Sequence, residues 1–131
     1  MQKIIIASGP VIVENNKVLL NKHGDTAFWK FCGGKVEDYE TDLMENAARE
    51  VREEMGLKIK ILNEQPFINF ARKDTAEGRV DIILVHFLAE RIGEIKPGED
   101  IREWKWFDLD NLPEDLGPNI IPALKYFGFM K

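Results

Sequence analysis

The stretch from Gly33 to Leu57 constrains the fold of this chain more than any other segment. It opens with a pair of glycines and continues as a helical pattern that a further glycine closes. Glu50, Glu53 and Glu54 are spaced i, i+3 and i+4 in that pattern, so their carboxylates share one helical face. Carboxylates held so close repel one another unless a cation lies among them, and Mg²⁺ and Mn²⁺ prefer hard oxygen ligands. We therefore interpret the stretch as a loop–helix unit that holds a divalent metal ion.

The apolar residues of the same helix predict which of its faces is buried. They recur at spacings of 4, 3 and 4, as in a stripe that faces a core: Met44, Ala48, Val51 and Met55. At about 100° per residue, the three glutamates centre about 130–140° away from that stripe. A solvated acidic face is the alternative interpretation of such a cluster. The glycine pair and the residues between it and the glutamates favour the metal site.

The composition of the chain limits the kinds of molecule that it can bind. The formal net charge is −5 and the isoelectric point is near 5.1, which argues against a nucleic-acid polymer. A small anionic ligand remains compatible with this charge, because a bound divalent ion reverses the local sign. The chain of 131 residues is long enough for one core, and we expect a single domain over residues 1–131, as a monomer or homodimer.

The single cysteine and the first residues of the chain indicate in which cellular compartment the protein is expected. Cys32 excludes an internal disulfide and fits a reducing compartment, and we expect a buried packing role for it rather than a nucleophilic one. No segment approaches the ~18 apolar residues of a membrane span. The first residues lack the basic region and cleavage site of a signal peptide. We therefore expect a cytoplasmic protein without a membrane partner.

Hydrophobic periodicity and turn residues predict an α/β (α+β) protein. Strands are predicted at 4–6, 11–14, 17–22, 29–31, 58–62, 67–72, 80–89 and 103–107, and helices from about 41 to 55 and from about 119 to 127. Ser8-Gly9-Pro10 is expected to interrupt the first strand, and Asn15-Asn16 to form a hairpin turn. The apolar segment 80–89 is expected to be central. This order of elements predicts an α/β/α sandwich with a mixed central sheet.

With these residues in view, the chain resembles the Nudix hydrolases of the MutT type. Their signature begins with a glycine and a glutamate six residues later, which Gly34 and Glu40 match. It closes with R-E-U-x-E-E-x-G-U, where U is a bulky aliphatic residue; this run corresponds to Arg49-Glu50-Val51, Glu53-Glu54 and Gly56-Leu57. One departure is an insertion: eight residues, Thr41–Ala48, separate Glu40 from Arg49 where the family has seven.

The resemblance implies an Mg²⁺- or Mn²⁺-dependent hydrolase of nucleoside diphosphates linked to a further group X. It implies that Glu50, Glu53 and Glu54 hold the ions together with the backbone carbonyl of Gly33. Glu53 would deprotonate the attacking water. Arg49 would pair with Glu40 or Glu50 and orient the cluster, and an ordinary surface pair of Arg49 with Glu45 or Glu53 is the alternative. The glycines of the signature, Gly34 and Gly56, would have structural roles, as would Glu40.

Further candidates lie outside the signature helix. By resemblance, Glu99 or Asp100 would supply another metal ligand, although a polar turn after Pro97-Gly98 explains them equally well. Lys35 could contact phosphate or could be solvated. Phe31 and Asn119 occupy places similar to those that grip a purine base in MutT-type enzymes. The alternatives are that Phe31 belongs to the core and that Asn119 is the N-cap of the last helix.

We therefore expect a nucleotide hydrolase, with nucleoside triphosphates cleaved to monophosphate and pyrophosphate. ADP-ribose or a dinucleoside polyphosphate is an alternative substrate. A non-catalytic nucleotide-binding sensor module is an alternative from another functional class. Crowded carboxylates argue against such a module, because without catalysis their mutual repulsion serves no purpose.

Overall fold

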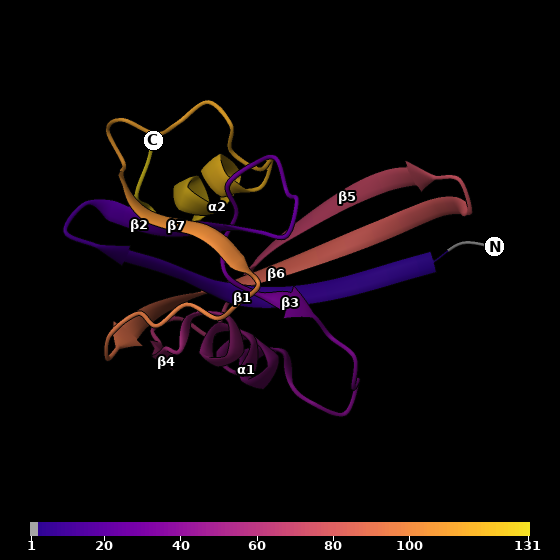
Figure 1. Ribbon diagram of the computed structural model, residues 1–131, viewed down its shortest axis with the longest axis horizontal. Helices are drawn as coiled ribbons and strands as arrows, with labels where there is room; N and C mark the ends of the chain where they lie inside the picture. The colour runs from indigo at the N-terminus through magenta and orange to yellow at the C-terminus, as the bar shows by residue number, and fades with distance from the viewer. Residues whose placement is uncertain (1–2) are drawn as a thin grey trace.

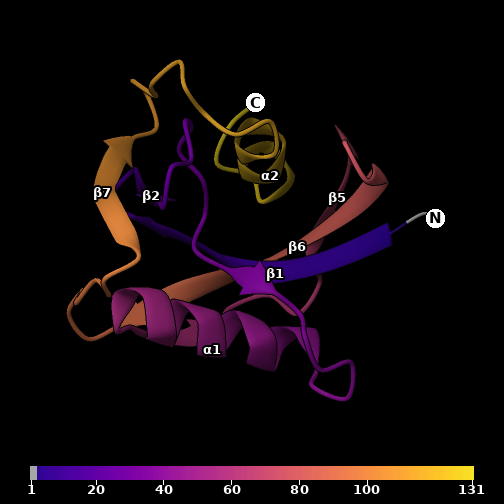
Figure 2. The ribbon, with the colours of Figure 1, turned by 45° about the vertical axis from the view of Figure 1, so that its right-hand side comes forward.

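A computed structural model describes residues 3–131 and shows a mixed sheet with one helix against each face (Figures 1 and 2). The elements are β1 (Lys3–Glu14), β2 (Lys17–His23), β3 (Gly34–Lys35), α1 (Leu43–Met55), β4 (Lys58–Ile61), β5 (Phe67–Thr75), β6 (Gly78–Ile92), β7 (Ile101–Asp108) and α2 (Ile120–Tyr126). The strand order is β4-β6-β1-β2-β7, with β3 paired to β1 and β5 to β6. The expected α/β/α sandwich with a mixed sheet is confirmed.

Strand β6 is central, as its apolar sequence predicted. It pairs in parallel with β1 and antiparallel with both β4 and β5. The β5–β6 hairpin extends beyond the two helices, next to the start of β1 (Figure 1). No helix within residues 3–131 has the length and apolar content needed to cross a membrane.

The predicted interruption of the first strand is wrong, because β1 runs unbroken from Lys3 to Glu14. Its middle pairs with β6, where Gly9 lies opposite His86 and Pro10 opposite Phe87. Gly9 is required by packing rather than by a turn, since a Cβ there would collide with the carbonyl oxygen of Cys32. Local sequence could not distinguish this close approach of a neighbouring loop from a break in the strand.

The predicted hairpin between β1 and β2 is confirmed. Asn15 and Asn16 have φ values of 50° and 63°, the left-handed conformation that a two-residue hairpin turn needs. The pairing places Glu14 opposite Lys17. The short strand predicted at 29–31 is reduced to two isolated bridges, one of which pairs Lys30 with Asn21.

Helix α1 begins and ends as predicted, but its buried face is rotated from the predicted stripe. The Asp42 side chain accepts a hydrogen bond from the Glu45 N–H at 3.0 Å, which caps the N-terminus. Gly56 ends the helix with a φ of 64°. The fully buried positions are Asn46, Ala47, Val51 and Met55, whereas Met44 and Ala48 are only partly buried.

Two apolar cores fill the space between the sheet and the helices. On the α2 side they include Val11, Val18, Leu20, Trp29, Phe31, Phe107, Ile120 and Leu124. On the α1 side they include Ile12, Leu19, Cys32, Ala47, Val51, Met55, Leu57, Val85 and Phe87. Cys32 is a buried packing residue, as expected, and burial raises the pKa of its thiol to about 12. Trp106 packs against the α1-side core, while Trp104 is 39% exposed.

Candidate active site

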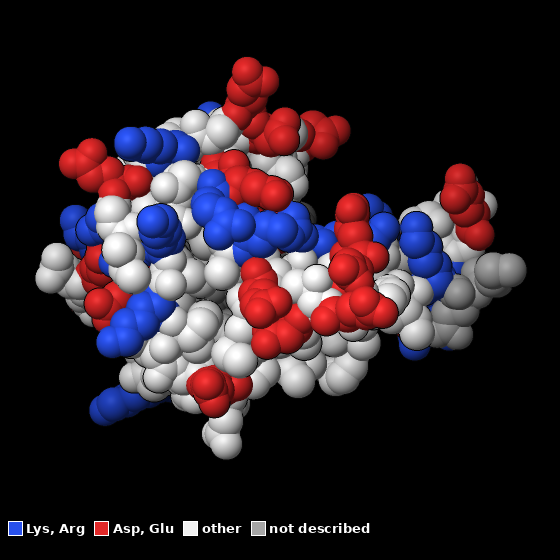
Figure 3. All heavy atoms as spheres, turned by 90° about the horizontal axis from the view of Figure 1, so that it is seen from below, with Lys and Arg blue, Asp and Glu red and all other residues white. Residues whose placement is uncertain are grey.

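The acidic face of α1 borders a hollow of about 280 Å³. The loop before β3 and the segment before β7 form its other walls, and the residues that line it are His23, Gly33, Gly34, Glu50, Glu53, Glu54, Gly98, Glu99, Asp100 and Ile101. Seen from the α1 side of the molecule, Asp and Glu side chains gather in groups between basic ones (Figure 3). The fold thus brings the three signature glutamates and both acids of the later loop to one place.

The glycine pair presses the loop against the helix. Gly33 has a φ of 149°, and a Cβ there would lie 2.6 Å from the carbonyl oxygen of Ser8. A Cβ on Gly34 would collide with the carboxylate of Glu50. The Gly33 N–H donates to Glu54 Oε1 at 2.8 Å. Glycine is required at position 33 by its φ and by the nearby backbone of Ser8, whereas a side chain at position 34 would displace the Glu50 carboxylate.

This close packing reduces the hydration of the Glu50 and Glu54 carboxylates. Burial raises the pKa of Glu50, although the neighbouring Arg49 guanidinium opposes the shift. Burial also raises the pKa of Glu54 to about 7, although the hydrogen bond from the Gly33 N–H opposes this shift. The Glu53 side chain is more open, with 58% of its surface exposed. A divalent cation would stabilise the charged forms of the two buried carboxylates.

The donor set fits a hard dication in its chemistry. Five carboxylates, from Glu50, Glu53, Glu54, Glu99 and Asp100, line the hollow, and oxygen ligands suit Mg²⁺ or Mn²⁺. Within residues 3–131 no three Asp, Glu, His or Cys side chains already stand together at ligand spacing. The five carboxylates are therefore candidate ligands that line one hollow rather than a ligand set already held at coordination distances.

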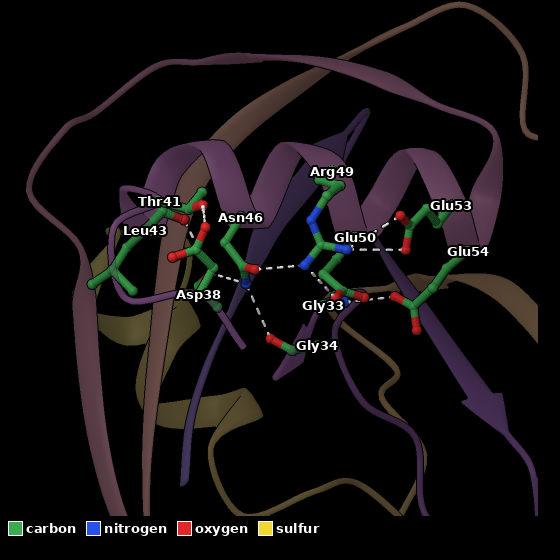
Figure 4. Close-up of polar contacts among 11 residues, drawn as sticks. Gly33, Gly34, Asp38, Thr41, Leu43, Asn46, Arg49, Glu50, Glu53 and Glu54 are labelled. Carbon is green, nitrogen blue, oxygen red and sulfur yellow. Dashed lines mark hydrogen bonds and ion pairs between the residues drawn. The ribbon is translucent and has the colours of Figure 1, made fainter. Parts of the chain in front are cut away.

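Arg49 lies between the glutamates and a buried asparagine (Figure 4). Its Nη2 donates to Glu50 Oε1 at 3.0 Å and to Asn46 Oδ1 at 2.8 Å. Its Nη1 contacts both carboxylate oxygens of Glu53 at 3.2 Å. Of the two partners predicted for Arg49, the structure selects Glu50.

Glu40, the other predicted partner, belongs to the turn that carries the inserted residue. It is exposed, and its N–H donates to Asp38 Oδ1 at 2.9 Å. Asp38 also accepts a hydrogen bond from the hydroxyl of Thr41 at 3.4 Å. None of the ion pairs in residues 3–131 joins the Glu40 carboxylate to Arg49. Glu40 is thus held in the turn before α1, while Glu50, Glu53 and Glu54 keep their i, i+3, i+4 spacing on the helix.

Three residues near the hollow were missed from sequence. Asn46, which is 1% exposed, holds Arg49; its spacing of three and four residues from Arg49 and Glu50 was a usable signal. His23 lines the hollow, and its Nε2 lies 3.4 Å from Nζ of Lys30. Burial lowers the pKa of Lys30, while the nearby Glu54 carboxylate opposes that shift. Lys35, by contrast, is exposed at the end of β3.

The predicted base-binding residues lie on the other face of the sheet. Asn119 is 7% exposed, and its Nδ2 donates to His86 Nε2 at 2.8 Å. Asn119 is the N-cap residue of α2, as the alternative interpretation expected, but its side chain makes no capping hydrogen bond. Phe31 is 3% exposed, and its ring centroid lies 4.8 Å from that of His86 in an edge-on contact. Burial lowers the pKa of His86 to about 4, which keeps the imidazole neutral at neutral pH.

Comparison with known proteins agrees with this fold. The NUDIX domain profile matches residues 5–127, so the chain belongs to the Nudix family. An ADP-ribose pyrophosphatase of Methanocaldococcus jannaschii is 35% identical over 114 residues, which cover 83% of this chain and 64% of that protein. The chain thus spans less than two thirds of this relative's length.

Solved structures give the same family. A MutT NUDIX hydrolase from Burkholderia pseudomallei superimposes with a TM-score of 0.75 and 26% identity, covering 94% of this chain and 97% of that chain. An ADP-ribose pyrophosphatase from Streptococcus suis gives a TM-score of 0.67 and 25% identity, covering 92% and 87% of the two chains. The similarity therefore extends across almost the whole sandwich.

Proposed function

We propose that this chain is a divalent-metal-dependent hydrolase that cleaves a phosphoanhydride bond of nucleoside diphosphate-X compounds. The observation that carries the proposal is the set of five carboxylates lining one hollow beside the glycine pair. Glu50, Glu54 and Glu53 would hold the ions with the Gly33 carbonyl, and Glu99 or Asp100 would add a ligand. A bound divalent ion neutralises the diphosphate and lowers the pKa of a coordinated water.

The protein's own side chains account for the remaining chemistry. Glu53 is the most open of the three signature glutamates, which suits it to accept the proton of the attacking water. The water oxygen bonds to phosphorus, the bridging P–O bond breaks, and the leaving phosphate, pyrophosphate or phosphate monoester departs with the bridging oxygen as an oxyanion. Arg49 holds Glu50 and Glu53 in place through its two amino groups.

We propose nucleoside triphosphates as the first substrate class, cleaved to monophosphate and pyrophosphate. The buried Asn119–His86–Phe31 group supports a purine, because an amide can donate to and accept from a base edge. ADP-ribose is the second candidate, favoured by the 35% identical relative that carries this activity in its name. Dinucleoside polyphosphates fit the same bond chemistry.

A panel of substrates tests the proposal directly. The purified chain would be incubated with Mg²⁺ and with each nucleoside triphosphate, ADP-ribose or a diadenosine polyphosphate, and the products separated by anion exchange. We expect monophosphate with pyrophosphate from a triphosphate, or AMP with ribose 5-phosphate from ADP-ribose. Excess EDTA should abolish turnover. Tight nucleotide binding without products from any substrate would instead favour the sensor module.

A further inference from the structure

Arg49 pairs with Glu50 but not with Glu40, the other partner that the signature implies. Glu40 lies in an exposed turn, where its backbone N–H donates to Asp38. The guanidinium of Arg49 instead bonds Asn46 Oδ1 at 2.8 Å, its shortest hydrogen bond. Asn46 lies one helical turn before Arg49, on the same face of α1 and against the sheet (Figure 4).

We propose that Asn46, anchored by Ser8, is the positioning residue that fixes Arg49 and through it the Glu50 and Glu53 carboxylates. The inference rests on the proposed metal-dependent hydrolysis and names a residue that takes over the place of Glu40. Asn46 itself touches neither substrate nor metal in this scheme. It acts by holding the guanidinium and the glycine loop in one arrangement.

The hydrogen bonds around Asn46 permit only one orientation of its amide. Ser8 Oγ donates to the Leu43 carbonyl at 3.0 Å, so its lone pair is left to accept from Asn46 Nδ2 at 2.8 Å. The same Nδ2 donates to the Gly34 carbonyl at 3.2 Å, an acceptor only. Oδ1 must therefore face Arg49, which can only donate.

This arrangement links three parts of the site through one buried side chain. Asn46 is 1% exposed and Ser8 is 2% exposed, so both are shielded from competing water. The bonds connect strand β1 at Ser8, strand β3 at Gly34 and helix α1 at Arg49. A buried network with every member satisfied is rigid, and removing one member leaves the others unpaired. Arg49 would then be free to leave Glu50 and Glu53.

The test measures metal binding as well as turnover in Asn46→Ala. We expect the Kd for Mn²⁺, followed by loss of its free EPR signal, to rise about 10–100-fold, and kcat to fall by a similar factor with little change in KM. In the metal-free protein, the Arg49 guanidinium protons should exchange with solvent faster than in the parent. That NMR readout depends on neither metal nor substrate.

Val85→Ala is the matched control. Val85 is 2% exposed, lies opposite Ser8 in the sheet register and packs on the same side as α1, but it takes no part in the hydrogen bonds. It should lower stability while leaving the Mn²⁺ affinity and Arg49 exchange unchanged. If Asn46→Ala shifts these two quantities no more than Val85→Ala does, Asn46 is structural only and the inference is wrong.

A double-mutant cycle tests whether Asn46 acts through Arg49. In an Arg49→Ala background, Asn46→Ala should change the Mn²⁺ Kd less than about twofold, because its target is already gone. If the double variant raises the Mn²⁺ Kd by the product of the two single-variant factors, the inference is wrong. Should Asn46→Ala fail to fold, Ser8→Ala removes the anchoring hydroxyl and carries the same test. A parent that binds Mn²⁺ but hydrolyses nothing would refute the proposed function while leaving the Mn²⁺ and exchange measurements valid.

Discussion

Two buried asparagines lie against opposite faces of the sheet and are used differently. Asn46, on the α1 side, has all its polar atoms bonded, and one of its partners is the charged Arg49. Asn119, on the α2 side, bonds the neutral imidazole of His86 within an aromatic environment that includes Phe31. The first asparagine belongs to a network of charges and the second to a neutral polar group.

We relate this difference to the two tasks of the proposed nucleotide hydrolase. Hydrolysis of a diphosphate would need ionised oxygens that hold a cation, and five carboxylates line the hollow beside α1. Recognition of a base would need neutral donors and acceptors, the role proposed for Asn119 beside Phe31 on the α2 side. The comparison predicts that changes on the α1 side alter rate and metal binding, whereas changes on the α2 side alter substrate preference.

The largest expected effect comes from the charge on Glu53. Glu53→Gln keeps the shape of the side chain but removes its basicity, so turnover should fall by about 10²–10⁴-fold. The measurement is kcat with saturating Mg²⁺ on the best substrate of the panel. Glu45→Gln is the control, because Glu45 is an exposed glutamate in the first turn of the same helix. Full activity in Glu53→Gln would remove the proposed mechanism.

The next prediction concerns His86 and the pH dependence of stability. The folded protein keeps the pKa of His86 at about 4, below the ordinary 6.5, so the unfolded chain binds more protons between these values. Stability should therefore be present in full above pH 6.5 and be lost as the pH falls toward 4. The loss is on the order of 3 kcal/mol.

The effect of His86 on stability must be separated from that of Glu54. The raised pKa of Glu54, about 7, makes the free energy of unfolding change with pH in the opposite direction over part of the same pH range. The difference in unfolding free energy between the parent and His86→Gln, followed from pH 8 to pH 4, removes the contributions common to both. A difference that does not vary with pH would mean that His86 is not held neutral. The contrast between a charged and a neutral side of the sheet would then fail.

A third prediction tests the metal site without substrate. Mg²⁺ at ten times its Kd should stabilise the folded state by about 1.4 kcal/mol and raise the Tm accordingly. The double variant Glu50→Gln, Glu54→Gln should be slightly more stable without metal, because two buried charges are gone. It should also show no Mg²⁺-induced shift. An unchanged shift would place the ion elsewhere.

The features that could be predicted from the sequence alone are those that depend on residues close together in the chain. The positions of the three glutamates on one helical face and the two ends of α1 were predicted because helical spacing and helix-end signals are decided within a few residues. The Asn15-Asn16 hairpin was predicted for the same reason. The order of the elements predicted a mixed sheet between helices, whereas the strand order β4-β6-β1-β2-β7 was not predicted, because no local pattern contains it.

The features that were missed depend on residues far apart in the chain. Asn46 and Ser8 are 38 positions apart, so their bond exists only once α1 packs on β1. The continuity of β1 through Gly9 depends on the loop at Cys32, and the bond of Asn119 depends on His86 in a strand 33 positions away. Sequence patterns describe the residues, but these pairings are products of the tertiary fold.

The smallest expected effect is a change of substrate preference at Asn119. Asn119→Asp can still accept but no longer donate, so a purine edge read by this amide should be discriminated less well. The ratio of kcat/KM for ATP and GTP to that for CTP and UTP should change about tenfold, the value of one hydrogen bond of about 1–1.5 kcal/mol.

His86→Gln separates base reading from packing in that measurement. It alters the partner of Asn119 and leaves the amide of Asn119 in place, so packing effects should appear in both variants and the loss of base reading only in Asn119→Asp. Asn119→Asp should also lose stability at neutral pH, because it places a carboxylate at a position that is 7% exposed. Equal nucleotide ratios in parent and variant would make Asn119 a structural residue. The two asparagines would then differ only in their partners and not in their tasks.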